Sequence, residues 1–209
     1  ARYGLDLVEG YGLTEASPVI ASALGTGAPR GSVGLPGPGL EVRLVDREGR
    51  DVLIGDTGEV WVRGPNVFAG YWEDEEATAR VLDSDGWLHT GDLAVVDDDG
   101  FLYLVDRAKD LIIVSGFNVF PAEVEEVLLE HHAIERAAVI GVPHPHTGEA
   151  VRAYVVTRDG FSIEEDDAIE FAASRLARYK CPNKVTFGEQ LPTGLGGKVI
   201  RRVLRESGN

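Results

Sequence analysis

The chain has 209 residues, of which 44% are hydrophobic and 26% charged, a composition typical of globular proteins with one large or two smaller domains. Its formal net charge of −15 argues against generic nucleic-acid binding, because a phosphate backbone would be repelled. No apolar run reaches the length of a membrane span, there is no signal-peptide layout, and a single cysteine, Cys181, leaves no internal disulfide. We therefore expect a cytoplasmic protein without an integral membrane segment.

The first informative stretch is EGYGLTEAS, near the start of the chain. Gly10 and Gly12 allow a ligand to approach the backbone, and Tyr11 offers a flat ring on which a base could stack. Thr14 offers a hydroxyl for a phosphate oxygen, and Glu15 offers a hard carboxylate for Mg²⁺. A short motif of this kind is equally consistent with a turn that contains a partly buried tyrosine, so it does not decide between a site and a turn by itself.

The next part of the chain is predicted to be rich in strands. After the Gly- and Pro-rich loop GSVGLPGPG, the segments LEVRLVD and GEVWVRG alternate apolar and polar residues, as half-buried strands do. LAVVD and FLYLVD continue the pattern across the Asp-Gly turn of DDDG, and EDEEATARVL is expected to be one short helix. Residues from about 40 to 106 are thus predicted to form a small antiparallel, β-barrel-like unit.

The pattern changes after Asp106. LIIVSG predicts a short strand, Pro121 opens a helix in PAEVEEVLLEHH, and RAAVIGV and VRAYVV predict two more strands. Ser162 and Glu165 have capping-box spacing and predict a helix that runs to about Ala177. KVIRRVLRE predicts a last, basic helix, so this half of the chain is expected to be a small α+β domain.

The C-terminal stretch is unusually basic. Between Arg175 and Arg205 there are eight basic residues and one acid, a local charge that would attract a compact polyanion such as a nucleotide, although a solvated helix face would account for part of it. Lys198 stands at the end of the glycine-rich loop TGLGGK. The loop PHPHTGE, with His144 and His146, is a weaker metal candidate, since such histidines are usually exposed to solvent.

Five segments, taken in order, resemble the C-terminal portion of the adenylate-forming superfamily of acyl-CoA synthetases, luciferase-type enzymes and adenylation domains: YGLTE, GEVWVRGPNVFAGYW, WLHTGDLA, DRAKDLIIVSGFNVFPAEVE and LPTGLGGKVIRRVLRE. The resemblance implies an α+β chain in which residues 1–106 form the C-terminal part of a large adenylate-binding domain. Residues 107–110 would be a hinge, and residues 111–209 a mobile C-terminal domain.

The resemblance also assigns roles to single positions. It implies nucleotide contacts for Gly10, Tyr11, Gly12, Thr14, Asp92, Arg107, Asn118 and Lys198. Tyr11 would pack against adenine, Thr14 would contact the α-phosphate, and Glu15 would bind Mg²⁺.

Four further assignments concern the ribose, the reacting carboxylate, the hinge and CoA. Asp92 and Arg107 would hold the ribose, and Lys198 would bridge the α-phosphate and the substrate carboxylate while the acyl-adenylate forms. Lys109 would be the hinge residue about which the C-terminal domain rotates between half-reactions. The passage for the pantetheine arm of CoA would be lined by Ser115 and Gly116.

These assignments lead to an expected function for a longer parent protein. We expect an ATP-dependent acyl-CoA synthetase that uses ATP, Mg²⁺ and coenzyme A, with a medium- or long-chain fatty acid as substrate and an aryl acid as the alternative. The Ser/Thr/Gly-rich phosphate loop of the family is absent from this sequence, so we expect the 209-residue chain alone to be inactive. Another possibility is a non-catalytic fragment that dimerises through apolar surface on residues 1 to about 35.

Overall fold

The computed structural model describes residues 7–194 and 197–207. It divides the chain into two compact units, Ala1–Ala108 and Lys109–Asn209, which are considered separately below. The boundary lies within residues 107–110, where the sequence predicts a hinge; that this segment moves as a hinge stays a prediction. Within the described part of the chain, the longest α-helices have nine residues, and no helix is long and apolar enough to cross a membrane.

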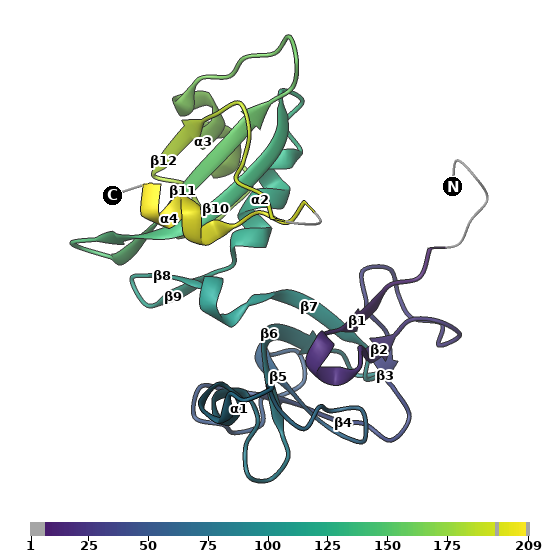
Figure 1. Cartoon of the computed structure of the whole chain (residues 1–209). Helices are drawn as coiled ribbons and strands as arrows, with labels where there is room; N and C mark the ends of the chain where they lie inside the picture. The colour runs from purple at the N-terminus through teal and green to yellow at the C-terminus, as the bar shows by residue number, and fades with distance from the viewer. Residues whose placement is uncertain (1–6, 195–196, 208–209) are drawn as a thin grey trace. The chain divides into compact units, whose positions relative to one another are not determined.

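The first unit consists of two antiparallel sheets and a short helix (Figure 1). The smaller sheet contains three strands in the order β1-β2-β3: β1 Gly10–Gly12, β2 Val19–Ser22 and β3 Leu35–Pro36. The larger sheet contains four in the order β4-β5-β6-β7: β4 Glu41–Val45, β5 Gly58–Arg63, β6 Leu88–Val96 and β7 Leu102–Arg107. Among the described residues β4 does not pair with β7, so this is an open sheet and not a closed barrel.

The alternation in the sequence explains how the two sheets share a core. Strand β5 alternates buried and half-buried positions along its whole length, so that Val60 and Val62 face inward. They pack in one cluster with Leu88 of β6 and with Tyr11 and Ile20 of the small sheet. The core of the first unit therefore fixes β1, which carries the GYG part of the first motif, against the larger sheet.

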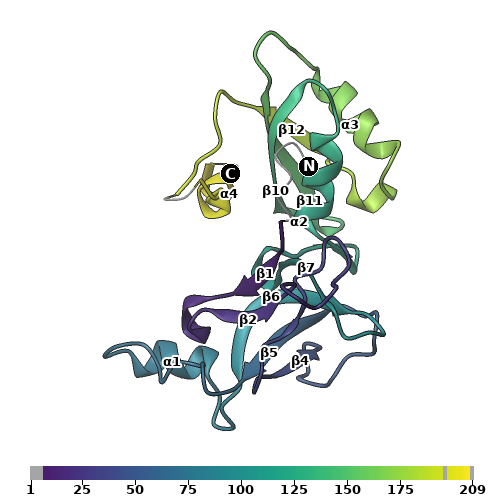
Figure 2. The same cartoon turned by 90° about the vertical axis from the view of Figure 1, so that its right-hand side faces the viewer.

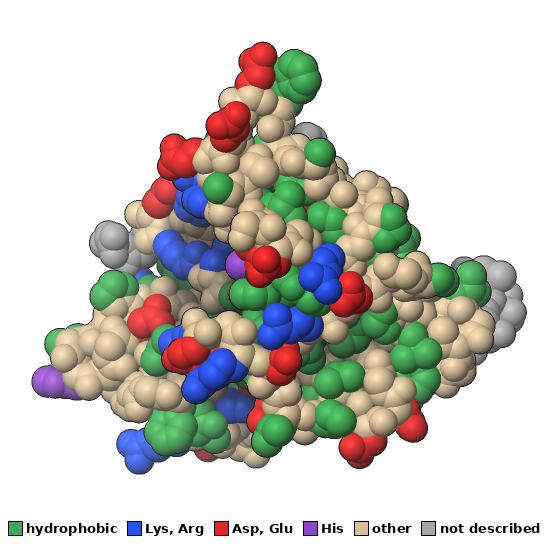
Figure 3. All heavy atoms as spheres, turned by 90° about the horizontal axis from the view of Figure 1, so that it is seen from below, with side chains coloured by type: hydrophobic (Ala, Val, Ile, Leu, Met, Phe, Trp, Pro, Cys, Tyr) green, Lys and Arg blue, Asp and Glu red, His purple; other side chains and the backbone are tan. Residues whose placement is uncertain are grey.

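Helix α1, Glu75–Val81, lies between β5 and β6, where one short helix was predicted. It begins where Asp74 accepts a hydrogen bond from the backbone N–H of Ala77, an N-cap that satisfies one free donor of the first turn. On the surface, acidic and basic side chains lie among hydrophobic ones (Figure 3).

The second unit is built on a five-stranded sheet. Its strands are β8 Ile112–Val114, β9 Phe117–Val119, β10 Ile134–His144, β11 Gly148–Thr157 and β12 Lys184–Phe187. The order is β10-β11-β8-β9, with β12 parallel to β11 and the other pairs antiparallel. Three helices complete it: α2 Pro121–Leu129, α3 Glu165–Ala173 and α4 Arg201–Ser207. The α+β class is confirmed.

Helices cover both faces of this sheet. Val139 of β10 packs with α2 and α3, whereas its neighbours Ala138 and Ile140 pack with Leu204 of α4. Because successive strand residues point to opposite faces, α4 lies on the face opposite α2 and α3, as Figure 2 shows. Strand β10 is left at the edge of the sheet, between α2 on one side and α4 on the other.

Two predicted helix boundaries in this unit were wrong. Helix α3 begins at Glu165 and ends at Ala173, and no side chain caps its N-terminus, so the capping box of Ser162 and Glu165 does not form. The carboxylate of Glu165 accepts the backbone N–H of Val185 on β12 instead, at 2.9 Å. The last helix begins at Arg201 and not at Lys198, because the residues before it form a tight loop.

Candidate active site

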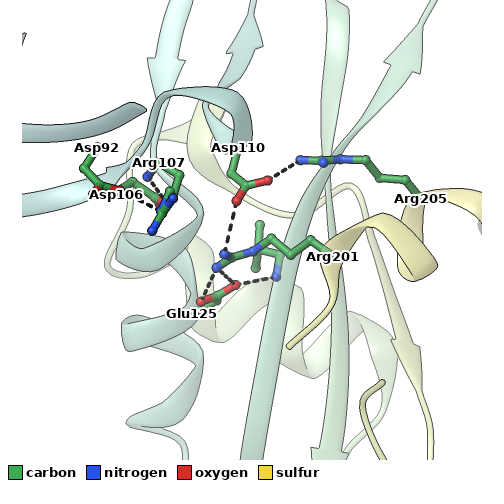
Figure 4. A network of polar contacts seen from close by, with 8 residues as sticks. Asp92, Asp106, Arg107, Asp110, Glu125, Arg201 and Arg205 are labelled. Atoms are coloured by element: carbon green, nitrogen blue, oxygen red, sulfur yellow. Dashed lines mark hydrogen bonds and ion pairs between the residues drawn. The ribbon is translucent and has the colours of Figure 1, made fainter. Parts of the chain in front are cut away.

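A buried carboxylate, that of Asp92 on β6, lies at the centre of a polar network in the first unit. Asp92 is 7% exposed and stands opposite Arg107 of β7 in the antiparallel register. Its Oδ1 lies 2.6 Å from the Arg107 Nε, and its Oδ2 accepts a hydrogen bond of 2.7 Å from the Tyr11 hydroxyl (Figure 4 shows Asp92 and Arg107). The two sheets of the first unit therefore bring together three residues that the resemblance assigned to nucleotide binding.

Burial of Tyr11 determines its role in this network. Removal of the phenol from water raises the pKa of Tyr11 well above its usual value of about 10, and the neighbouring Asp92 charge adds to the increase. Tyr11 therefore stays protonated and donates its hydrogen to Asp92. With the side chain 7% exposed in the described residues, its predicted packing against adenine remains a prediction.

Another carboxylate of the candidate site, that of Glu15 in the stretch EGYGLTEAS, lies in a 3-10 turn formed by Thr14–Ala16. The hydroxyl of Tyr71 donates to its Oε1 at 2.7 Å, and the backbone N–H of Phe68 donates to its carbonyl oxygen at 2.9 Å. The side-chain amide of Asn66 donates to the carbonyl oxygens of Ala16 and Val19, at 2.7 and 2.9 Å. The segment 66–71 thus holds both the backbone and the carboxylate of the Glu15 turn.

The glycines of the motif differ in their surroundings. A Cβ atom on Gly12 would collide with the carbonyl group of Pro18, whereas one on Gly10 would meet the Ala21 oxygen at 3.3 Å. Gly12 is required so that the chain can fold back from β1 into β2. Gly10 and Thr14 are exposed, so their backbone and hydroxyl groups are open to a ligand.

Glu15 fits the requirements of a magnesium ligand in one respect. Mg²⁺ in nucleotide sites is held by one or two carboxylates together with phosphates and water, and Glu15 is a half-buried carboxylate with one oxygen fixed by Tyr71. Among the described residues there is no cluster of three or more His, Cys, Asp or Glu that could hold a metal by itself. That includes the His144 loop, which forms the turn between β10 and β11.

The remaining predicted residues lie in the second unit. Lys109 is exposed in a 3-10 turn, Ala108–Asp110. Ser115 and Gly116 form the tight turn between β8 and β9, with φ angles of 51° and 85°, and Asn118 follows, exposed, on β9. A positive φ at the non-glycine Ser115 is uncommon and shows that the turn is tightly constrained.

Lys198 is exposed at the end of the glycine-rich loop. The loop closes on itself, because Thr193 bridges to Val199 and the N–H of Gly194 donates to the Lys198 carbonyl oxygen at 2.9 Å. Leu195 and Gly196, which belong to the predicted glycine-rich loop, lie outside the described residues.

The basic C-terminal stretch is less positive in effect than its sequence predicts. Five of its eight basic residues form ion pairs: Arg175, Lys180, Arg201, Arg202 and Arg205. Four of them pair with acids from earlier segments of the chain, and Arg202 pairs with Glu206 of the same helix. Lys180, for example, places its Nζ 2.6 Å from Glu123 of α2. Within the described part of the chain, Arg178, Lys184 and Lys198 have no such partner, so the free positive charge is smaller than expected.

Sequence reasoning missed Tyr71 and Asn66. Both lie in a segment, NVFAGYW, that contributed to the resemblance as a whole but gave no local sign of a contact with Glu15, from which Tyr71 is separated by 56 positions. Two cavities of the first unit, of about 360 and 510 Å³, are not lined by Tyr11, Glu15 or Asp92, although Tyr71 borders the larger one. We therefore define the candidate site by its polar contacts.

Comparison with known protein families shows what the chain is similar to. Residues 1–72 match the model of the AMP-binding enzyme family, and residues 123–198 match that of the AMP-binding enzyme C-terminal domain. A long-chain-fatty-acid–CoA ligase of Yersinia pestis is 49% identical over 209 residues, 97% of this chain and 36% of the relative. A feruloyl-CoA synthase of Amycolatopsis sp is 46% identical over 204 residues, 97% of this chain and 41% of the relative.

Solved structures of CoA synthetases have the same fold over almost the whole of this chain. ATP-bound MatB from Rhodopseudomonas palustris matches with a TM-score of 0.90 and 40% identity, over 98% of this chain and 41% of that one. The o-succinylbenzoate CoA synthetase MenE from Bacillus subtilis, in complex with the acyl-adenylate intermediate OSB-AMP, matches with a TM-score of 0.87 and 35% identity over 98% of this chain and 42% of that one. The chain spans little more than a third of the length of the first curated relatives. Both matched models and these relatives show that the chain belongs to the adenylate-forming superfamily of AMP-binding enzymes.

Proposed function

We propose that the chain is the C-terminal part of an ATP-dependent acyl-CoA synthetase. The full-length protein would join a carboxylate to the α-phosphate of ATP, with release of pyrophosphate, and then transfer the acyl group from AMP to the CoA thiol. The observation that carries the proposal is the Tyr11–Asp92–Arg107 network, whose Tyr11 stands three residues before the Thr14–Ala16 turn. Relatives named as fatty-acyl and feruloyl-CoA ligases support the same reaction class.

The Asp92 carboxylate is suited to the ribose. An ionised carboxylate accepts about four hydrogen bonds, so Asp92 can keep those from Tyr11 and Arg107 and still accept two more from the ribose hydroxyls. Its two present donors fix the direction in which the remaining lone pairs point. We propose that this preorganisation orients the nucleotide, with Arg107 half-exposed beside it.

Positive charge near the phosphates would come from Lys198 and from Mg²⁺. Glu15 would help to hold the Mg²⁺, which would supply electrostatic stabilisation of phosphate oxygens. Lys198 would place its ammonium group between the attacking carboxylate and the α-phosphate, where negative charge builds up in the transition state. Thr14 would donate its hydroxyl to an α-phosphate oxygen.

The second half-reaction would use the second unit. We propose that Lys109 acts as the hinge about which this unit turns, and that Ser115 and Gly116 line the path of the pantetheine arm. Their constrained, side-chain-poor turn leaves the backbone open to a narrow ligand. Asn118 on the same hairpin would contact the nucleotide.

The substrate we propose is a medium- or long-chain fatty acid, which the names of several relatives favour, with an aryl acid as the alternative. The test is a screen of the full-length protein with saturated fatty acids of graded length and with hydroxycinnamic acids, by AMP release in the presence of CoA. A maximum of kcat/KM among the fatty acids is expected. A clear preference for a hydroxycinnamic acid favours the alternative, and no AMP release with any acid contradicts the proposal.

The 209-residue chain by itself is proposed to be inactive. The measurement is AMP release by the purified chain with ATP, Mg²⁺, fatty acid and CoA, and turnover above background contradicts this proposal. Within the described residues 7–35, four large apolar side chains are exposed: Leu7, Val8, Val19 and Leu24. They support self-association of the isolated chain, which sedimentation over a range of concentrations tests. The cytoplasmic location remains part of the proposal, supported by the lone, unpaired Cys181.

A further inference from the structure

Among the described residues, strand β10 pairs with β11 on one side only, and a side chain from α2 satisfies one N–H group of its other edge. Glu125 of α2 accepts the outward backbone N–H of Val139 on β10 through its Oε1, at 2.7 Å. The free N–H groups of an edge strand otherwise need water or another chain as partner. Glu125 therefore fastens helix α2 to the edge of the sheet.

The same carboxylate reaches around that edge to α4, on the other face. Arg201 donates through its Nη2 to both oxygens of Glu125, at 2.7 and 2.9 Å (Figure 4). The two side chains are 21% and 17% exposed, so the pair is largely shielded from water. A charge-assisted contact in such surroundings is stronger than a surface ion pair.

A second acid contacts α4 from another direction. Asp110 follows Lys109 directly, and its side chain is 8% exposed. Its Oδ1 accepts from the Arg205 Nη2 at 2.8 Å, and its Oδ2 lies 3.6 Å from the Arg201 Nη1 (Figure 4). Two arginines one helical turn apart are thus held by two acids from segments far away in the sequence.

These contacts matter for α4 because the helix is short. A helix of seven residues is not stable in water by itself, and its order must come from docking. Besides the ion pairs, the docking contacts include the buried Leu204 and a hydrogen bond of 3.2 Å from the Tyr154 hydroxyl to the Leu204 carbonyl oxygen. Loss of the ion pairs would remove the contacts that hold the Arg201 side chain, at the first residue of α4, to Glu125 and Asp110.

That end of the helix is joined directly to the Lys198 loop. Ile200 precedes Arg201, and its N–H donates to the Pro192 carbonyl oxygen at 2.8 Å, which closes the base of the loop. Lys198 itself is exposed. The position of the Lys198 backbone, from which its side chain extends, is therefore set by the base of the loop and by the first turn of α4.

We propose that Glu125 and Asp110 are positioning residues for Lys198: through Arg201 and Arg205 they anchor helix α4, and through α4 the loop that presents the lysine to the acyl-adenylate-forming centre. Neither acid touches the substrate. The inference rests on the proposed function for its catalytic consequence, but the anchoring itself can be measured without any reaction.

The test compares Glu125→Gln with Glu126→Gln in the full-length protein. In Glu125→Gln the side chain keeps an oxygen for the Val139 N–H, but it places an amide N–H₂ group or a neutral oxygen against Arg201. Glu126, the neighbouring residue on the same helix, is exposed and serves as the control. In Glu125→Gln we expect backbone amide hydrogen exchange at Gly194 and Ile200 to become at least tenfold faster. Acyl-AMP formation should fall by about 10- to 100-fold, the cost of a small misplacement of a catalytic group. Thioester formation from supplied acyl-AMP should change little, and Glu126→Gln should match the wild type.

A milder pair of variants covers the case in which Glu125→Gln does not fold. Arg201→Lys keeps the charge but loses the forked donor, so it should show the same two effects to a smaller degree. Arg202→Lys changes a neighbouring arginine whose side chain is 82% exposed, and should change neither.

Each result decides one point. Unchanged exchange in Glu125→Gln overturns the anchoring, and faster exchange with normal acyl-AMP formation overturns the positioning role. Equal losses in both half-reactions also overturn it, because they indicate general destabilisation. If the wild-type protein makes no acyl-AMP, the proposed function fails, while the exchange rates still decide whether Glu125 anchors the loop.

Discussion

The network around Asp92 gives a prediction whose magnitude follows from the structure. In Asp92→Asn the shape of the side chain is kept and its charge is removed. The Tyr11 hydroxyl then donates to a neutral amide oxygen and not to a carboxylate, and the Arg107 guanidinium loses its partner at 2.6 Å. The new amide N–H₂ group also faces one of these two donors.

The expected loss is a sum of two terms. A hydrogen bond to a buried charged group contributes about 1.5–3 kcal/mol and one to a neutral group about 0.5–1.5 kcal/mol, so the Tyr11 contact loses about 1–1.5 kcal/mol. The Arg107 side chain is 48% exposed, so its pair is screened and contributes about 0.2–1 kcal/mol. We expect Asp92→Asn to lower the free energy of unfolding of the first unit by about 2 kcal/mol.

Tryptophan fluorescence during urea unfolding measures this loss selectively. All three tryptophans, Trp61, Trp72 and Trp87, belong to the first unit, so their signal reports on its unfolding. With a urea dependence of about 1–3 kcal/mol per molar, the midpoint should fall by about 1 M. Asp98→Asn, in an exposed turn, should leave it unchanged. An unchanged midpoint in Asp92→Asn refutes the claim that Asp92 is held by Tyr11 and Arg107.

Three further predictions concern the same unit. In the folded state Tyr11 keeps its proton, whereas the unfolded side chain ionises near pH 10. The free energy of unfolding should therefore fall as pH rises above about 10, by up to about 1.4 kcal/mol per pH unit. Tyr11→Phe should reduce this slope, measured by urea unfolding at alkaline pH. Gly12→Ala should destabilise the unit by about 1–3 kcal/mol in urea unfolding, because its Cβ collides with backbone, and Gly10→Ala should cost less. Tyr71→Phe removes the hydrogen bond from the Tyr71 hydroxyl to Glu15, which is exposed to solvent and therefore weak. The Mg²⁺ concentration needed for ATP binding by the full-length protein, measured by calorimetry, should rise about threefold. Tyr103→Phe, which removes a hydrogen bond to Asp97, should leave it unchanged.

Each of these predictions has a contradicting result. An alkaline slope that is the same with and without Tyr11 would show that its hydroxyl is not protected from ionisation. Equal costs for the two glycine variants would mean that the Gly12 turn has room for a side chain. An Mg²⁺ dependence unchanged in Tyr71→Phe would separate this tyrosine from metal binding, even if its contact with Glu15 is real.

Local patterns were sufficient for much of the fold. The alternation in GEVWVRG appears as the alternating burial of β5, and the Asp-Gly turn forms with Gly100 at a φ of 85°. Pro121 opens α2, where its missing N–H costs nothing. These predictions succeeded because each rests on residues only a few positions apart.

Several of the errors and omissions share one physical cause, contacts between residues that are far apart in the sequence. Glu165 does not cap its own helix because Val185, on a distant strand, takes its carboxylate. Tyr11 contacts Asp92 across 81 positions and Arg201 contacts Glu125 across 76. No local propensity encodes such pairs, so the sequence could nominate site residues but not their contacts, and it overestimated the free positive charge near the C-terminus.

The most direct test of the account is the effect of Lys198→Ala on the two half-reactions of the full-length protein. Pyrophosphate exchange measures acyl-AMP formation, and CoA acylation from supplied acyl-AMP measures the second step. We expect Lys198→Ala to abolish the first and largely keep the second, and Lys184→Ala, at an exposed lysine of β12, to affect neither. Equal losses in both steps, or normal acyl-AMP formation without Lys198, would contradict the proposed role of this residue in adenylation.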